Sequence, residues 1–245
     1  MEETVSLQVG LEVHIQLKTE TKLFCGCPTE FTVTPNVHIC PVCLGYPGSL
    51  PKMNRKAVEQ VLLLSSALKC TIAPASYQSR KNYFYPDLPK GYQISQYQVP
   101  IAREGVMEYW HKGTFARCRI LRVQLEEDTA KMVHLGGKSL LDYNRAGIPL
   151  VEVITAPDFF SIPEVISFLK ELRLLLRFLN ISDANIEEGS MRCEPNLTVE
   201  VNGRKGEKVE IKNLGSFRSV ERALQYEVRR QIALLKEGRK VLRQT

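Results

Sequence analysis

The stretch VSLQVGLEVHIQLKT, residues 5–19, alternates apolar and polar side chains, with apolar residues at every odd position from 5 to 17. A period of two is typical of a β-strand with one buried face. Glu12 and His14 therefore leave the same face of this strand, roughly 6–7 Å apart. They could hold one ion or one proton together, although a polar face turned to solvent is the plainer interpretation.

Composition places the chain among globular proteins with a mild excess of basic residues. Its 245 residues, 44% hydrophobic, allow one large domain or two modest ones. The net charge of +6 fits a nucleic acid or a nucleotide. The acidic N-terminus does not resemble a signal peptide, and no apolar run reaches membrane-spanning length. Seven cysteines, four of them clustered, indicate a reducing compartment and hence a cytoplasmic location.

The rest of the chain mixes helices with strands. Its patterns predict a helix opened by Asn54, a strand over 114–126 with a bulge near Ile120 and Leu121, a buried strand over 149–154, an enclosed helix opened by Ser161, a hairpin over 191–211 and a last helix capped by Ser219 and stopped by Gly238. The Tyr/Pro/Gly-rich segment 74–100 predicts an ordered loop. Hairpins outnumber β-α-β units, so we expect an α+β fold with a largely antiparallel sheet.

Two pairs of closely spaced cysteines predict a zinc site. Cys25 and Cys27 form the motif CGC, and Cys40 and Cys43 enclose CPVC. Four thiolates on two short turns supply the tetrahedron that structural zinc takes, and a closed shell leaves no open position for catalysis. Redox activity or plain burial is the alternative.

Acidic residues recur in four separate segments. They are Glu12 beside His14, the run Glu126, Glu127 and Asp128, Glu152 within the apolar PLVEVI, and EEGS at 187–190. A carboxylate inside an apolar strand is costly unless it is paired or binds a cation. Converging carboxylates and one imidazole would suit Mg²⁺, which usually serves phosphates. Each acid alone could equally be a surface charge.

The segment SRKNYFYPDLPKGYQISQ, residues 79–96, combines basic and aromatic side chains. Arg80, Lys81 and Lys90 could clamp phosphates, and the tyrosines offer stacking faces for a nucleotide or a single-stranded RNA end. A purely structural loop is the alternative. The sequence has no Walker, Rossmann or kinase glycine motif, so any ATP site is of another type.

Several of these motifs together resemble one family. The segments GLEVHIQLKT, CPVCLGYPGSLP, RKNYFYPDLPKGYQISQ, LEEDTAK, DYNRAGIPLVEVITAPD, EEGSMRCEPN and EIKNLGSF are similar, in order and spacing, to the B subunit of the aspartyl/glutamyl-tRNA amidotransferase. The similarity runs from about Val9 to the last residue.

The resemblance implies a cradle domain over 1–245 with a zinc knuckle in 20–50, continued in the family by helical and tail domains that this chain lacks. It implies that ATP and Mg²⁺ activate the side-chain carboxylate of misacylated tRNA, Glu-tRNA(Gln) or Asp-tRNA(Asn), for attack by ammonia from the A subunit, with a small C subunit as further partner. Carried over by motif, the metal-binding set is Glu12, His14, Glu127 and Glu152, with Glu126 less favoured. Candidates for contacts with the nucleotide are Arg80, Lys81, Lys90, Lys212 and Asn213.

Two departures from the family pattern concern the site. Thr129 and Ala130 stand where Ala-Gly is common, and Gly215 stands where Asn is usual. Two other interpretations remain: a zinc-containing tRNA-binding scaffold without catalysis, and the related archaeal subunit specific for Glu-tRNA(Gln). Buried acids would be of no use to a scaffold.

Overall fold

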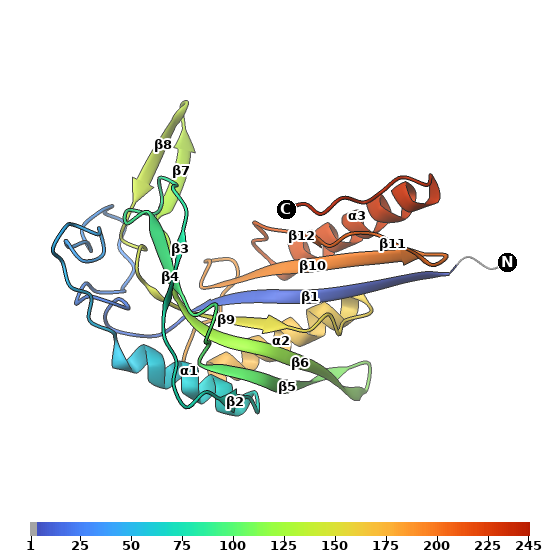
Figure 1. The fold of residues 1–245 in the computed structure, drawn as a ribbon, viewed down its shortest axis with the longest axis horizontal. Coiled ribbons are helices and arrows are strands. Elements are labelled where there is room, and N and C mark those ends of the chain that lie inside the picture. Colours follow the sequence, from blue (N-terminus) through green and yellow to red (C-terminus); the bar gives the residue numbers. More distant parts are fainter. Residues whose placement is uncertain (1–3) are drawn as a thin grey trace.

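The computed structural model describes residues 4–245, and its centre is one eight-stranded sheet (Figure 1). The strands pair in the order β11-β10-β1-β9-β6-β5-β2, and β12 also pairs with β10. Their bounds are β1 (Val5–Gln16), β2 (Thr71–Ile72), β5 (Ala102–His111), β6 (Thr114–Glu127), β9 (Pro149–Thr155), β10 (Met191–Val201), β11 (Arg204–Lys205) and β12 (Val209–Glu210). Every one of these pairings is antiparallel, which confirms the predicted fold class.

Two hairpins form small two-stranded sheets of their own. One joins β3 (Ser79–Asn82) to β4 (Tyr92–Ser95), so the segment predicted as a loop over 74–100 contains two strands. The other joins β7 (Lys131–Leu135) to β8 (Lys138–Asp142) and projects beyond the end of the sheet (Figure 1). The sequence patterns did not predict the β7–β8 hairpin or strand β5.

Three helices begin at side-chain caps. Asn54 caps α1 (Arg55–Ala67) and Ser161 caps α2 (Ile162–Phe178), as predicted. The cap of α3 (Phe217–Lys236) is Ser216, and Ser219 is its partner three residues into the helix, so the predicted cap was wrong by three positions. Gly238, with a positive φ of 71°, follows the end of α3 as expected. No helix within residues 4–245 is long and apolar enough to cross a membrane.

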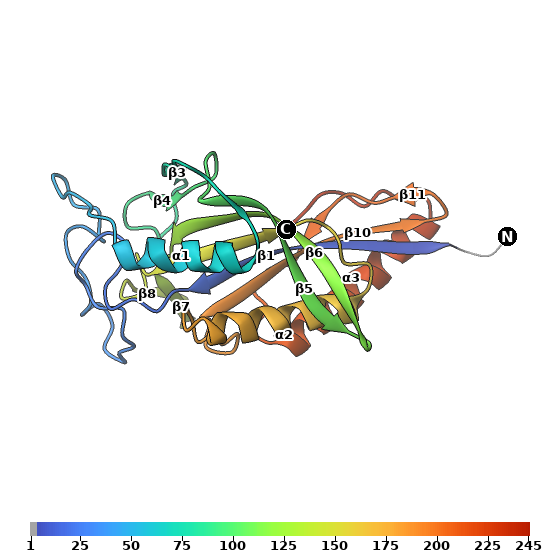
Figure 2. The same ribbon diagram turned by 90° about the horizontal axis from the view of Figure 1, so that it is seen from below.

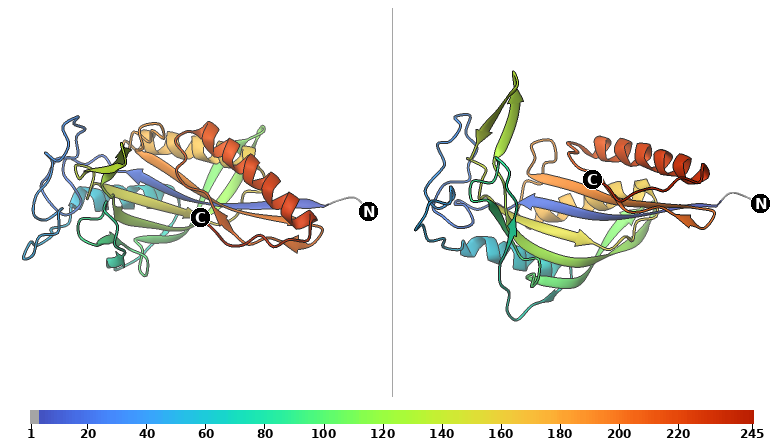
Figure 3. Two further views of the ribbon diagram at one scale, coloured as in Figure 1. Left: turned by 90° about the horizontal axis from the view of Figure 1, so that it is seen from above. Right: turned by 45° about the horizontal axis from the view of Figure 1, so that its top comes forward.

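The helices cover one face of the sheet, and we call the opposite face the open face. Buried side chains of all three helices join the inward-facing residues of β1, β6, β9 and β10 in one core. Helix α2 is not enclosed on every side as predicted, because Leu174 and Phe178 on its outer surface are exposed. Figure 2 shows α2 on one side of the sheet and β3 and β4 on the other. The two views in Figure 3 show α3 crossing beside β10.

Strand β6 contains the predicted irregularity. Its pairing with β9 shifts register between Ile120 and Arg122, so Leu121 is an extra residue. On the β5 side, the pairing likewise passes from Arg103 to Gly105 opposite these residues, and Glu104 has a positive φ of 55°. Beyond the bulge, Val123 and Leu125 enter the core while Gln124 and Glu126 lie on the open face.

Candidate metal and active site

Three side chains from three neighbouring strands meet on the open face. His14 of β1 lies directly opposite Glu152 of β9, and Glu126 extends from the end of β6. The Nδ1 atom of His14 is 3.4 Å from Glu126 Oε2, and its Nε2 atom is 3.9 Å from Glu152 Oε1. One ligand atom from each residue lies within 4.8 Å of the others, which is the spacing that one metal ion requires.

Burial and the neighbouring charges together shift the pKa values of the three residues in this cluster. Burial lowers the pKa of His14, but the hydrogen bond with Glu126 and the charges of Glu152 and Glu126 outweigh it and raise that pKa to about 9. Burial and the neighbouring Glu126 charge raise the pKa of Glu152 to about 8. Burial also acts to raise the pKa of Glu126, yet His14 and Ser95 hold it down at about 2. The two glutamates thus compete for one positive partner.

Neutral groups around the cluster fit a hard cation. Ser95 Oγ donates to Glu126 Oε1 at 2.7 Å, and the side-chain amide of Gln124 donates to both glutamates. The side-chain carbonyl oxygen of Gln124 is buried and has no hydrogen-bond partner within residues 4–245. Two carboxylates and an orphaned amide oxygen form a donor set suited to Mg²⁺, which His14 could join only after losing the proton that the two glutamates hold on it.

A second acidic group adjoins the first. Glu12 lies opposite Glu194 on β10, and with Glu210 of β12 these residues also bring one oxygen each within 4.8 Å. Lys212 binds this group, 2.9 Å from Glu194 and 3.4 Å from Glu210. Asn196 donates to Glu12 at 3.0 Å, and its own carbonyl oxygen is buried without a partner within the described residues. The group is therefore partly neutralised by Lys212.

Glu127 lies apart from both groups. Its carboxylate contacts Lys90 Nζ at 2.5 and 2.6 Å and accepts a hydrogen bond from the backbone amide of Ile94. The predicted metal-binding set was Glu12, His14, Glu127 and Glu152. In the structure Glu126 meets His14 and Glu152, whereas Glu12 lies in the adjoining acidic group and Glu127 in neither. Alternation along β6 could have shown this difference, because Glu127 shares the parity of Val123 and Leu125 rather than that of Gln124 and Glu126.

The remaining nucleotide candidates are dispersed. Arg80 and Lys90 line a cavity of about 180 Å³ between the β3–β4 hairpin and the cysteines. Both cations also lie over the ring of Tyr92, at 4.5 and 5.1 Å from its centroid. Lys81 is exposed on β3, 5.9 Å from the centroid of Tyr83, and Asn213 is exposed before α3. The structure brings together Arg80 and Lys90 but not Lys81 or Asn213.

Asp128, at the end of β6, contacts side chains from three other segments of the chain. It accepts from Arg192 at 3.0 Å and from Gln16 at 2.9 Å, and Arg145 is 3.7 Å away. Burial, the largest influence, acts to raise the pKa of Asp128, but the two arginines and Gln16 hold it below its usual value. The acids of the segment 187–190, by contrast, are exposed in a turn.

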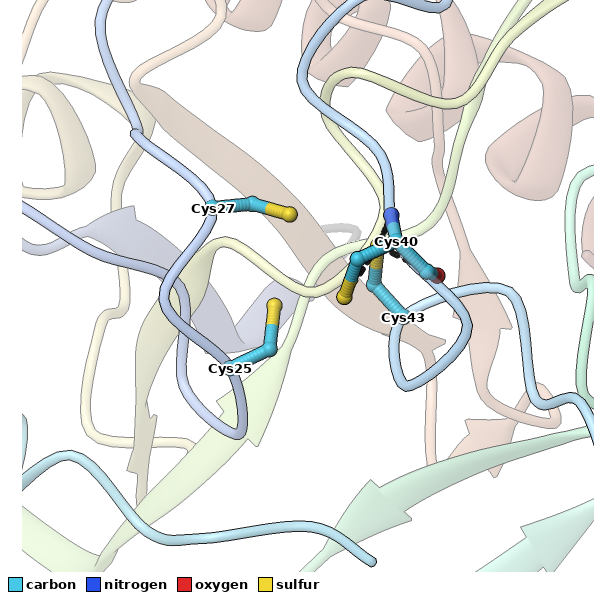
Figure 4. Close-up of side chains that lie close together, drawn as sticks. All are labelled: Cys25, Cys27, Cys40 and Cys43. Carbon is cyan, nitrogen blue, oxygen red and sulfur yellow. Dashed lines mark hydrogen bonds between the residues drawn. The ribbon is translucent and has the colours of Figure 1, made fainter. Parts of the chain in front are cut away.

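The four clustered cysteines approach one another from two loops. Cys25 and Cys27 come from one loop and Cys40 and Cys43 from the other, with their sulfurs turned toward a common centre (Figure 4). All four sulfurs lie within 4.8 Å of each other, and those of Cys40 and Cys43 are 3.9 Å apart. Tetrahedral zinc, with bonds of about 2.3 Å, sets its sulfurs roughly 3.8 Å apart. The cluster therefore fits a structural zinc site, as predicted.

A buried lysine supports the cysteine cluster. Lys22 is only 1% exposed, and its Nζ lies 3.7 Å from Cys43 Sγ and donates to the carbonyls of His38 and Tyr143. The Cys25 thiol, the Cys40 amide and Lys22 lower the pKa of Cys43 to about 5. A four-thiolate zinc centre carries two net negative charges, and Lys22 offsets one of them. Sequence periodicity gave no sign of this lysine.

Fold and site together define a catalytic-domain type: an antiparallel sheet with a carboxylate–imidazole cluster on its open face and a four-thiolate knuckle at one end. Residues 7–245 match the family model described as the GatB/GatE catalytic domain. The chain belongs to this family, which confirms the resemblance found in its sequence.

Three curated relatives are each named as the B subunit of an aspartyl/glutamyl-tRNA(Asn/Gln) amidotransferase. The chain is 51% identical to that of Thermodesulfovibrio yellowstonii over 240 residues, 52% to that of Thermomicrobium roseum over 244 and 48% to that of Clostridium kluyveri over 240. Each match covers 97% of this chain and 50% of the relative. The chain thus spans about half the length of the curated relatives it matches.

Proposed function

We propose that this chain activates the side-chain carboxylate of Glu or Asp on misacylated tRNA by phosphorylation from ATP, and that ammonia then displaces the phosphate. The observation that carries the proposal is the cluster of His14, Glu126 and Glu152 on the open face. Its donor set suits Mg²⁺, and phosphoryl transfer depends on charge neutralisation and alignment more than on covalent help from the protein.

The residues of the cluster have separate tasks in this reaction. Bound Mg²⁺ would neutralise the transferring phosphate and align its oxygens. Gln124 and Ser95 fix the orientation of Glu126 through hydrogen bonds at 3.1 and 2.7 Å. His14, which contacts both Glu126 and Glu152, offsets part of their negative charge. A phosphorylated carboxylate gives ammonia a good leaving group, which a free carboxylate lacks.

The same proposal assigns the surroundings of the site. Residues 1–245 form the cradle, and its zinc knuckle within 20–50 is structural rather than catalytic. Glu12 belongs to the adjoining acidic group, and Arg80 and Lys90 are the candidates for phosphate contacts because they line the cavity of about 180 Å³. From the resemblance of the sequence to the B-subunit family we take the A subunit as ammonia source, the C subunit and the misacylated tRNA as partners. The clustered free cysteines favour the cytoplasm as the location.

The test is phosphate release from ATP by the chain mixed with its A and C partners, with and without Glu-tRNA(Gln) or Asp-tRNA(Asn). We expect release that depends on the misacylated tRNA and falls at least 100-fold in Glu152→Gln. The control is Glu108→Gln, which changes an exposed glutamate on the same face that pairs with Arg117 at 2.9 Å. Release that persists in Glu152→Gln would contradict the assignment of the cluster.

A further inference from the structure

Two arginines lie side by side on the open face without a carboxylate. Arg103 of β5 is directly opposite Arg122 of β6, and each is next in sequence to a core residue, Ala102 or Val123, so both lie on the open face. Neither has an ion-pair partner within residues 4–245. Like charges directly opposite each other destabilise a sheet, so this pair is costly in the absence of an anion.

The other arginines of the same strand are neutralised. Arg117 pairs with Glu108 at 2.9 Å, and Arg119 holds Asp158 through two hydrogen bonds at 2.7 and 2.9 Å. Arg122 instead has a buried Nε atom with no hydrogen-bond partner in the described chain. Arg103 donates a hydrogen bond from its guanidinium to the backbone carbonyl of Gln98. The unpaired charge is therefore concentrated at Arg103 and Arg122.

An aromatic ring lies beside the two arginines, and we call Arg103, Arg122 and Tyr97 together the platform. The guanidinium of Arg122 lies over Tyr97, 5.2 Å from the ring centroid, and Tyr97 is 66% exposed. Gln96 fixes the segment to β6, because its side-chain carbonyl accepts from the backbone amide of Leu125 at 2.8 Å. A guanidinium fork binds phosphate in bidentate fashion, and an exposed tyrosine beside it offers a stacking face for a base.

The distance between the two arginines and the acidic cluster indicates which ligand could reach both. Arg122 and Glu126 are four residues apart on β6, or about 13 Å along the strand. In an aminoacylated RNA, about ten single bonds of about 1.5 Å separate the side-chain carboxylate from the 5′-phosphate of the terminal nucleotide, an extended span of roughly 12–13 Å. A carboxylate at the cluster would thus place that phosphate at the two arginines.

We propose that Arg103, Arg122 and Tyr97 bind the terminal nucleotide of an RNA acceptor end, its phosphate on the guanidinium groups and its base on the tyrosine ring. The proposal rests on the proposed function, because the acidic cluster sets the position of the aminoacyl group. ATP shares the nucleoside phosphate chemistry, and the experiment separates the two ligands.

The experiment measures the affinity of the chain for a fluorescein-labelled RNA minihelix that ends in single-stranded CCA. We expect Arg103→Gln with Arg122→Gln to weaken binding at least tenfold and to reduce the salt slope of log K by about 1–2. The matched control, Arg117→Gln with Arg119→Gln, removes two positive charges from β6 and should change RNA affinity less than threefold. Tyr97→Ala should weaken binding, whereas Tyr97→Phe should not.

Three results would overturn the proposal. The first is an equal loss of RNA affinity in the two double variants. The second is absence of RNA binding by the unaltered chain. The third is loss of affinity for ATP but not for RNA in Arg103→Gln with Arg122→Gln. If the glutamine variants fail to fold, lysine at both positions keeps the charge but removes the fork, and should lower affinity with an unchanged salt slope.

A separate variant distinguishes failure of this site from failure of the proposed function. Glu152→Gln should leave RNA affinity unchanged, since it lies at the cluster rather than at the platform. Normal RNA binding that depends on Arg103 and Arg122, without any phosphate release, would contradict the proposed activity and support the binding site.

Discussion

Glu126 and Glu127 are neighbours in the chain but face opposite sides of β6. Glu126 meets His14 on the open face, whereas Glu127 lies with its side chain 4% exposed against Lys90, itself 11% exposed. A buried ion pair of this kind is weak evidence for stability, yet the loss of one partner leaves an uncompensated charge. The two acids therefore differ in the effect that their removal should have.

Glu127→Gln is expected to lower the free energy of unfolding by about 1–3 kcal/mol, because Lys90 would remain buried without its counter-charge. Denaturant unfolding followed by circular dichroism measures this change. Adding Lys90→Met to Glu127→Gln should restore part of the loss, since the unpaired ammonium is then absent. A double variant less stable than the sum of the two single changes would contradict the pairing.

Asp128 should make stability depend on pH in the acid range. Its folded pKa lies below the unfolded value of about 4, so its contribution is complete above pH 4 and disappears as the pH falls through the folded pKa. Asp128→Asn should therefore cost about 1–3 kcal/mol at pH 7 and progressively less below pH 4. Urea unfolding across pH 2–7 tests the trend, and a constant difference would refute it.

At the scale of elements, the start of α3 allows a sharp comparison. Ser216 accepts from the amide of Ser219 at 3.0 Å, and Ser219 Oγ accepts from the amide of Ser216 at 2.9 Å. Ser216→Ala should lower stability by about 1 kcal/mol, and Ser219→Ala by less, because the N-cap bond is the stronger determinant. Thermal unfolding of both variants would show the order, and the reverse order would make Ser219 the functional cap.

The sequence was most informative where one local pattern decides the structure. Alternation determined β1 and β10, the short apolar run 149–154 indicated β9, and the phase slip near Ile120 predicted the bulge in β6. Strand β5 was not predicted because Glu104 and Gly105 interrupt its alternation of apolar and polar residues. The β7–β8 hairpin was not predicted because it is largely exposed and so has no apolar face in its sequence. Helix α2 was predicted too deeply buried because apolar residues such as Phe178 also occur on its exposed side.

The site was predictable in part for the same physical reason. Side chains that share a strand, such as Glu12 and His14, could be placed on one face, and the paired cysteines could be grouped by spacing. Contacts between distant segments could not, because nothing local links Lys22 to Tyr143 or Arg192 to Asp128. Choosing Glu126 over Glu127 needed the alternation of β6 to be followed to the end of the strand.

For the molecule as a whole, zinc should hold the knuckle to the sheet. Removal of the metal with a strong chelator should lower the melting temperature by on the order of 5–10 °C and speed amide exchange in residues 20–50. Elemental analysis should find one zinc per chain before treatment. These changes follow because the bound ion would join the two cysteine-bearing loops to each other, and its removal leaves thiols in their place.

A matched pair of cysteine variants separates the metal site from general packing. Cys27→Ser should abolish stoichiometric zinc, whereas Cys70→Ser, which alters an isolated half-buried thiol, should retain it. Equal zinc content in both variants would show that the four thiolates do not form the site.

The paired irregularity at Glu104 and Leu121 has a consequence for how relatives of this chain can differ in length. Leu121 is surplus against β9, where Thr155 and Ile154 pair with Ile120 and Arg122 without a gap, and Glu104 accompanies it on β5. Deletion of both residues would leave every other side chain on its present face. We therefore expect insertions and deletions at these two positions to be inherited together, whereas a lone deletion on β5 would move Arg103 out of register with Arg122.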